Sequence, residues 1–321
     1  MSRFAKFTWV LLVYNLVVII WGAVVRATGS GAGCGAHWPT CHGDILPTVH
    51  ETATLIEFTH RVTSGIVLLL VIILIVWAWR TLPRGHPVRL GAVLVTVLTI
   101  VEALLGAGLV LFALVADNDS LARAIVMSLH LINTFLLLAA LTLTAWWASG
   151  GPVLQFRGQR RVIWTLVPAF VGMLALGMTG SVAALAGVLF PSESVVAGFQ
   201  ANFDAASHFV VRLRILHPIT AILVGGYIVF AARWLNRYRP APLTEQLSWA
   251  LSGLFVVQLA VGAMTIVLLS SIWMQMMHLL LADLAWIVLV LLTASVLRVS
   301  DTVEHRSLTT LERWPVGALE R

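Results

Sequence analysis

Residues 56–79 decide the fold, and they read IEFTHRVTSGIVLLLVIILIVWAW. From Val62 to Trp79 the chain carries no charged side chain. A run of about 18 apolar residues is long enough to cross the hydrocarbon core of a bilayer as a helix. The segment therefore predicts a transmembrane helix whose first turns carry a carboxylate, an imidazole and a guanidinium.

The rest of the chain has the same character. Of its 321 residues, 60% are apolar and 11% are charged, whereas a soluble domain has about 45–50% apolar and about 25% charged residues. This composition excludes a soluble enzyme and a disordered chain, and indicates an all-α polytopic membrane protein. The apolar runs predict eight spans, at 8–26, 56–79, 89–115, 122–147, 162–190, 208–234, 246–270 and 273–298.

The first run resembles a signal peptide in that Arg3 and Lys6 precede it. Because no Ala-x-Ala cleavage site follows, we interpret it as a retained span. Of the 20 lysines and arginines, only four lie in the loops on the side away from the termini, with Arg61 just inside a helix end. By the positive-inside rule, both termini are expected to be cytoplasmic. The net charge of +6 is then a topology signal, and no nucleic-acid partner is expected.

The two halves of the chain repeat several features in the same order. The pairs are Thr28-Gly29-Ser30 and Thr179-Gly180-Ser181, His60 and His217, Glu102 and Gln258, and His130 and His278. Four spans per half make the repeats parallel, and each half is expected to form a four-helix bundle. We assign 1–150 to the N-terminal bundle, with its outer loop at 27–55, 151–300 to the C-terminal bundle, and 301–321 to a cytoplasmic tail.

Four of the ten histidines lie inside predicted spans, about 5 to 9 residues from the outer ends: His60, His130, His217 and His278. An ionisable residue inside a membrane is costly and indicates a functional site. Two imidazoles at one depth in each bundle suit a porphyrin with an axial histidine on each side. The alternative is four histidines that only hydrogen-bond between helices. A zinc ion would require more ligands than two per bundle.

Glu57 lies three residues before His60, on the same helix face. A carboxylate beside a buried macrocycle is a candidate acid–base residue or cation stabiliser. Its counterpart in the second half is Arg214, so the two pockets differ at this position. The alternative for Glu57 is a carboxylate that only stabilises the start of its helix.

Four arginines stand at the outer ends of helices, against the positive-inside bias: Arg61, Arg123, Arg212 and Arg214. They are possible contacts for heme propionates, because arginine binds carboxylates in bidentate geometry. Contact with lipid headgroups is the alternative. Cys34 and Cys41 lie in the outer loop, where a disulfide is chemically sensible. Such a bridge is structural or redox-active, and a zinc site with His37 and His42 is a weaker alternative.

Taken together, these residues resemble the heme A synthase family (the CtaA/Cox15 type). The matching segments are Thr28-Gly29-Ser30-Gly31, the Cys34…Trp38-Pro39…Cys41 loop, Ile56-Glu57-Phe58-Thr59-His60-Arg61, and the histidines at 130, 217 and 278. The resemblance covers nearly all of residues 1–300. One departure is the outer loop between spans 5 and 6, which is short and contains no cysteine.

The resemblance implies oxidation of the C8 methyl group of heme O to a formyl group, giving heme A. It implies substrate heme at His60 and His130, a resident heme b with His217 and His278 as axial ligands, and Glu57 as a catalytic residue. The partners expected are heme O, an electron acceptor, the farnesylating heme O synthase and the lipid bilayer. The alternatives are a di-heme electron carrier of the cytochrome b561 type and a heme transporter without chemistry.

Overall fold

The computed structural model describes residues 1–48 and 51–298, and in them eight helices are long and apolar enough to cross a membrane. Together with three short helices they are α1 (Arg3–Ala27), η1 (Ser30–Ala32), α2 (Thr52–Thr81), α3 (Pro87–Leu111), α4 (Leu121–Ala148), α5 (Arg160–Leu189), α6 (Val195–Ala201), α7 (Phe209–Leu213), α8 (Leu216–Tyr238), α9 (Pro242–Val267) and α10 (Ile272–Val296). The predicted all-α class with eight spans is confirmed. The cytoplasmic tail expected at 301–321 lies outside the described residues. So do two of the ten histidines, His50 and His305.

Helix starts follow the local sequence rather than the apolar runs. Ser2 accepts the Ala5 N–H at 3.0 Å and begins α1, and Ser120 accepts the Arg123 N–H at 3.2 Å and begins α4. Pro87 and Pro242 occupy first-turn positions in α3 and α9, where their missing N–H groups leave no bond unmade. The helices α1, α2 and α9 therefore begin about four residues before the predicted spans.

The sixth span is interrupted. The helix α7 ends at Leu213, and α8 begins two residues later, at Leu216. Across this break the His217 N–H donates to Arg214 O, three residues back. Pro218 then falls in the first turn of α8, where proline is tolerated. The break in the span therefore lies at residues 214–215, ahead of His217 and Pro218.

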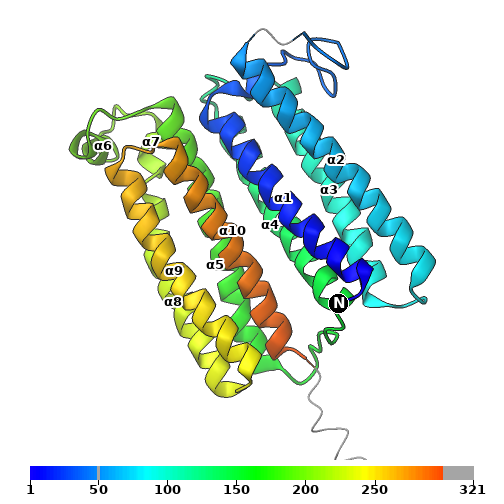
Figure 1. Cartoon of the computed structure of the whole chain (residues 1–321). Coiled ribbons are helices and arrows are strands. Elements are labelled where there is room, and N and C mark those ends of the chain that lie inside the picture. Colours follow the sequence, from blue (N-terminus) through cyan, green and yellow to red (C-terminus); the bar gives the residue numbers. More distant parts are fainter. Residues whose placement is uncertain (49–50, 299–321) are drawn as a thin grey trace, which may run out of the picture.

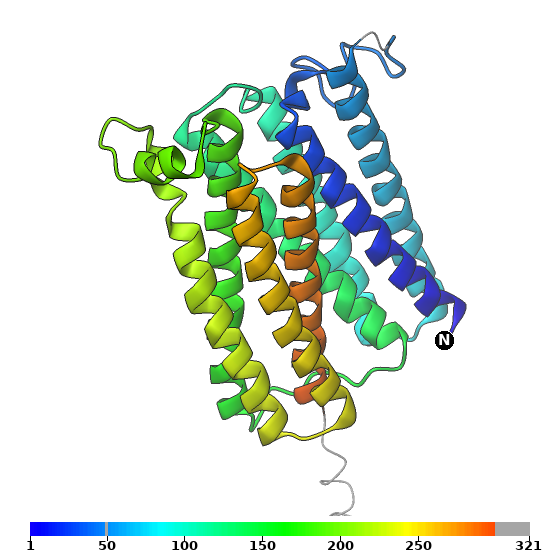
Figure 2. The ribbon, with the colours of Figure 1, turned by 60° about the vertical axis from the view of Figure 1, so that its left-hand side comes forward.

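Two groups of four long helices lie side by side, α1–α4 in one and α5, α8, α9 and α10 in the other (Figures 1 and 2). The groups meet where α4 packs against α5 and α10 and where α1 packs against α10. Between α4 and α10 the rings of Phe135 and Trp286 stack with centroids 5.0 Å apart. The Trp286 Nε1–H donates to Phe135 O at 2.6 Å. Both side chains are almost fully buried, so their aromatic packing stabilises the contact between α4 and α10.

The outward faces of the helices are apolar, as a lipid environment requires. Ile222 and Leu223 of α8, for example, are 66% and 68% exposed. We call the end of the molecule that carries the α1–α2 loop the disulfide end, and the end where α1 begins the opposite end (Figure 1). The even-numbered spans α2, α4, α8 and α10 all run from the disulfide end to the opposite end.

Candidate functional site

The four span histidines lie near the disulfide end of the molecule. His60, His130 and His278 fall within the first ten residues of α2, α4 and α10, and His217 is the second residue of α8. At 1.5 Å per residue they are all within about 15 Å of a helix start. The structure thus brings two imidazoles to one level in each group of helices.

Each histidine faces a glycine of the preceding long helix. A Cβ atom at that glycine would lie 2.9 Å from His60, 3.9 Å from His130, 3.0 Å from His217 and 2.9 Å from His278, for Gly22, Gly106, Gly180 and Gly262 respectively. The distances at Gly22 and Gly262 are shorter than real Cβ contacts, the one at Gly180 is a tight contact, and the one at Gly106 is ordinary. The absence of a side chain at these glycines is therefore what makes room for the imidazole rings.

In the second group of helices, His217 and His278 approach each other from α8 and α10. Their ring centroids are 6.0 Å apart and their planes are nearly perpendicular, at 88°. The Thr179 hydroxyl of α5 lies 3.3 Å from His217 Nδ1. A partner at Nδ1 fixes the orientation of the ring and leaves Nε2 as the nitrogen for a metal.

This pair fits a porphyrin iron. An imidazole nitrogen binds a metal at about 2 Å, so two rings that share one ion have centroids on the order of 6 Å apart. Within the described residues, no group of three or more His, Cys, Asp or Glu side chains could hold a metal ion. The remaining ligands of an ion between His217 and His278 must then come from a bound group, as they do in heme.

In the first group of helices, Glu102 of α3 lies beside His130 of α4. Glu102 Oε1 lies 3.1 Å from His130 Nδ1, and its carboxylate accepts hydrogen bonds from Asn133 and Thr134 of α4. In the second group Gln258 takes the matching place, where its amide donates to His278 O at 2.9 Å. Glu102 thus links α3 to α4 and holds the His130 ring at Nδ1.

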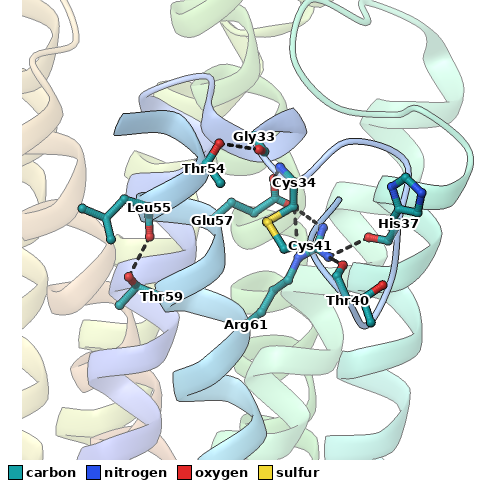
Figure 3. The surroundings of a disulfide bond; sticks show 10 residues. All are labelled: Gly33, Cys34, His37, Thr40, Cys41, Thr54, Leu55, Glu57, Thr59 and Arg61. Carbon is teal, nitrogen blue, oxygen red and sulfur yellow. Dashed lines mark hydrogen bonds and ion pairs between the residues drawn. A yellow bond between two sulfur atoms is a disulfide. The ribbon is translucent and has the colours of Figure 1, made fainter. Parts of the chain in front are cut away.

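Glu57 is 3% exposed and both of its oxygens have partners (Figure 3). Oε2 accepts the Cys34 N–H at 2.7 Å, and Oε1 accepts two N–H groups of Arg61, which lies one turn further along α2. Arg61 also donates to His37 O at 2.6 Å and to Thr40 O. The pair therefore fastens the disulfide loop to α2.

This contact differs from the helix-start alternative for Glu57. The helix α2 begins at Thr52, and its N-cap residue is Glu51, whose side chain makes no capping bond. Glu57 is the sixth residue of the helix, beyond the first turn, where the macrodipole has little effect. Its burial comes from the loop folded over it, so capping does not explain a carboxylate at this position.

Cys34 and Cys41 form a disulfide bond, and both are buried. Since their sulfur atoms bond to each other, the alternative zinc site with His37 and His42 is wrong. The ring closed by the bond contains Trp38 and Pro39 and lies over the start of α2 (Figure 3).

Three of the four arginines proposed as propionate contacts have loop partners. Arg61 binds the disulfide loop, Arg123 donates to Ala116 O and to Asn118 O at 2.7 Å, and Arg214 donates to Asn202 Oδ1 at 2.6 Å and to Gly198 O. Each therefore holds a loop at the disulfide end, a role that the sequence does not reveal. Arg212 is exposed, and a propionate contact for these arginines stays a prediction.

Two charged residues lie outside the predicted set. Arg26 at the end of α1 donates to Gln275 of α10 at 3.2 Å, so it bridges the two groups of helices, and its Nη1 is buried without a partner in the described residues. Asp283 of α10 is completely buried. The signal for Asp283 is present in the sequence, because it is the one acid within the apolar run LLLADLAWIVLVLL at 279–292.

Comparison with known proteins gives one family. The model of a family described as cytochrome oxidase assembly protein (COX15-CtaA) matches residues 5–290. A heme A synthase of Bacillus licheniformis is 29% identical over 264 residues, covering 78% of this chain and 82% of that protein. A heme A synthase of Alkalihalophilus pseudofirmus is 44% identical over 97 residues, or 30% of this chain and 33% of that protein.

The chain is also 49% identical over 296 residues to a protein of Thermus thermophilus named protoheme IX farnesyltransferase. The match covers 92% of this chain but 49% of that relative, so the chain spans about half the length of the first relatives it matches. The name of that relative can therefore refer to the half of its length that this chain does not match.

Proposed function

The chain belongs to the family of cytochrome oxidase assembly proteins, and we propose that it is a heme A synthase, a membrane oxidoreductase that converts the C8 methyl group of heme O to a formyl group. The observation that carries the proposal is the presence of two histidine pairs of different surroundings. Glu57 lies three residues before His60 on α2 and Glu102 lies 3.1 Å from His130, whereas His217 and His278 lie beside Thr179 and Gln258.

This difference assigns a role to each half. The N-terminal bundle, residues 1–150, binds heme O between His60 and His130, since acid–base chemistry needs the carboxylates there. The C-terminal bundle, residues 151–300, holds heme b with His217 and His278 as axial ligands. The 6.0 Å between their ring centroids supports this assignment.

Heme b, when bound, supplies a one-electron acceptor for the reaction. Hydroxylation of the methyl group by water releases two protons and two electrons, and a second hydroxylation followed by loss of water gives the formyl group. The protons need acceptors inside the protein. Glu57, three residues before His60, and Glu102, 3.1 Å from His130, are the carboxylates nearest to the substrate histidines that we propose.

Glu57 serves this chemistry from a fixed place. Its carboxylate is held by the Cys34 N–H and by Arg61, so it cannot turn away from the start of α2. A preorganised carboxylate stabilises positive charge that develops on a neighbouring carbon at no cost of reorientation. The disulfide loop covers this carboxylate and keeps it from water, which strengthens the electrostatic effect.

The orientation in the membrane follows from the basic residues. Arg80, Arg84, Arg160, Arg161 and Arg237 lie at the opposite end of the bundles, where α2 and α8 end and α5 begins. The positive-inside rule then places both termini in the cytoplasm and the histidine pairs near the outer face. A disulfide at the outer face agrees with an oxidising compartment.

We further propose that the chain works beside a heme O synthase and passes electrons to a separate acceptor. The relative from Thermus thermophilus supports the first part, because it contains the matched sequence, has about the same length outside the match and is named for the farnesylation of protoheme IX. A di-heme carrier across the membrane would need hemes near both faces, and the four histidines lie at one end.

Pigment analysis tests the function. The full chain is produced in cells that make heme O but no heme A, and the extracted hemes are separated by chromatography and identified by mass. Heme A is expected with the natural chain and lost with His60→Ala or His130→Ala. Unchanged heme O alongside a protein that carries heme b would show an electron carrier instead and overturn the proposal.

A further inference from the structure

Asp283 is a buried acidic residue inside a membrane-spanning helix. It lies in the middle of α10, it is 0% exposed, and neither of its oxygens has a hydrogen-bond partner in the described part of the chain. A bare carboxylate in an apolar interior costs several kcal/mol or more, so such a group persists where it binds a proton or has a function. Asp283 has no role in the proposed reaction.

The helix geometry places Asp283 between the two groups of helices. It follows His278 by five residues, which is about 140° around the axis and about 7.5 Å along it. His278 faces Gly262 of α9 within its own group, so Asp283 points to another side. Trp286, one turn later on that side, contacts Phe135 of α4 through its indole.

The level of Asp283 can be read from the same contact. The helices α4 and α10 run in the same direction, and Trp286 is level with Phe135. Asp283, three residues earlier, is therefore level with about residue 132 of α4. That is the level at which Glu102 binds Asn133 and Thr134 beside His130.

The charged groups around Asp283 come from several elements. Glu102 of α3, which is bonded to Asn133 and Thr134 of α4, lies at the same level along the helices. The helix α4 carries His130 at this level and Arg123 near the disulfide end, and α1 carries Arg26 near the disulfide end and Tyr14, whose hydroxyl donates to Thr63 O. The remaining titratable groups of the elements that pack on α10 lie at the opposite end: Arg3, Lys6, Arg160, Arg161 and Glu245.

We propose that Asp283 binds a proton when the heme held by His217 and His278 accepts an electron. The electron comes from the substrate methyl group, whose hydroxylation releases equal numbers of protons and electrons. One of these protons converts the Asp283 carboxylate to the acid, so the charge of the interior does not change when the iron is reduced. The inference rests on the proposed function for the heme at His217 and His278 and for the source of the electron and the proton.

The test is the pH dependence of the midpoint potential of this heme in the purified full chain, measured without heme O. If one proton is taken up with each electron, the midpoint potential falls by up to 59 mV for each unit by which the pH rises. Each pH unit is a tenfold change in proton activity. We expect this slope in the natural chain and a much smaller one in Asp283→Asn. The two curves should meet at low pH, where Asp283 is protonated in both redox states, and diverge at high pH.

Thr293→Val is the matched control, since the Thr293 hydroxyl of the same helix donates to Leu289 O and lies ten residues beyond Asp283 along α10. Its curve should follow that of the natural chain. An Asp283→Asn curve that keeps the full slope overturns the inference but leaves the proposed function intact. A chain that binds no redox-active heme overturns both.

A second measurement needs no variant. The infrared difference spectrum between reduced and oxidised protein should show the C=O stretch of a protonated carboxyl group on reduction, and the band should move when the chain is labelled with ¹³C-aspartate. A difference spectrum in which no carboxylic acid band moves with this label would also overturn the inference.

Discussion

Glu57 combines a structural contact with the charge that the proposed reaction uses, and the two can be separated. We expect Glu57→Gln to retain heme b and to lose formyl formation by about 10²–10³ in rate, the usual cost of one preorganised electrostatic contact. The amide oxygen of glutamine can still accept the Cys34 N–H. The rate of heme A formation, with the heme b spectrum as a measure of folding, checks this.

Arg61→Gln is the control for Glu57. It removes the hydrogen bonds to His37 O, Thr40 O and Glu57 Oε1, but it keeps the Glu57 carboxylate and its bond from the Cys34 N–H. If Glu57 only holds the loop, the two variants should lose activity equally. Normal heme A formation by Glu57→Gln would remove the residue from the mechanism.

The axial ligands give the second prediction at the scale of single residues. His217→Ala and His278→Ala should each abolish most of the bis-histidine absorption spectrum of the purified protein, since a low-spin iron needs both axial ligands. His60→Ala should leave that spectrum in place, because His60 belongs to the other group of helices. Full heme content in both C-terminal variants would contradict the ligand assignment.

At the scale of helices, the glycines opposite the histidines fix how closely the helices approach. A Cβ at Gly262 of α9 would lie 2.9 Å from the His278 ring, so Gly262→Ala must displace the imidazole. Overpacking of this kind costs about 1–3 kcal/mol, which corresponds to roughly 5- to 150-fold weaker binding of heme b. Titration of the heme-depleted protein with heme measures the change in affinity.

Gly253 provides the matched control on the same helix. A Cβ at Gly253 would meet nothing within 4 Å, so Gly253→Ala should bind heme b as the natural chain does. Equal affinities of the Gly262 and Gly253 variants would show that the His278 ring does not keep its place when heme is bound.

The disulfide loop gives a prediction for an irregular element. In Cys34→Ser the loop keeps its contacts to Glu57 and Arg61 but loses the ring closed by the bond. We expect slower formation of heme A with unchanged heme b content, because the loop is bonded to α2 of the first group of helices, whereas His217 and His278 belong to α8 and α10 of the second. An equal loss of heme b would show that the loop supports the whole fold.

The helices themselves can be predicted from the sequence because apolar length alone determines a span. Their ends cannot, since Ser2, Ser120, Pro87 and Pro242 set them through caps and first-turn positions outside the apolar runs. The histidines can be predicted from their depth. The loop contacts of Arg123 and Arg214 cannot, because their carbonyl partners depend on how the loops fold.

At the scale of the whole molecule, the contact between the two groups of helices cannot be predicted from the sequence. Phe135 and Trp286 have no distinguishing spacing, although together they set the level of α10 against α4. Asp283 illustrates the same limit. Its presence in an apolar run is visible in the sequence, but its level beside His130 and Glu102 follows only from the packing of α10 on α4.

The orientation of the whole molecule gives the last prediction. Both cysteines of the chain are in the disulfide, so a single added cysteine is the only thiol that can react. Ala205→Cys lies in the exposed link between α6 and α7 at the disulfide end, and Thr81→Cys lies at the exposed end of α2 at the opposite end. If the basic residues set the topology, a membrane-impermeant maleimide should label Ala205→Cys in intact cells, and should label Thr81→Cys only after the membrane is opened. Labelling in the reverse order would put the disulfide and the histidine pairs on the cytoplasmic side, where a disulfide is not maintained. Reduction before labelling serves as an internal check, because it exposes Cys34 and Cys41 on the side that carries the loop.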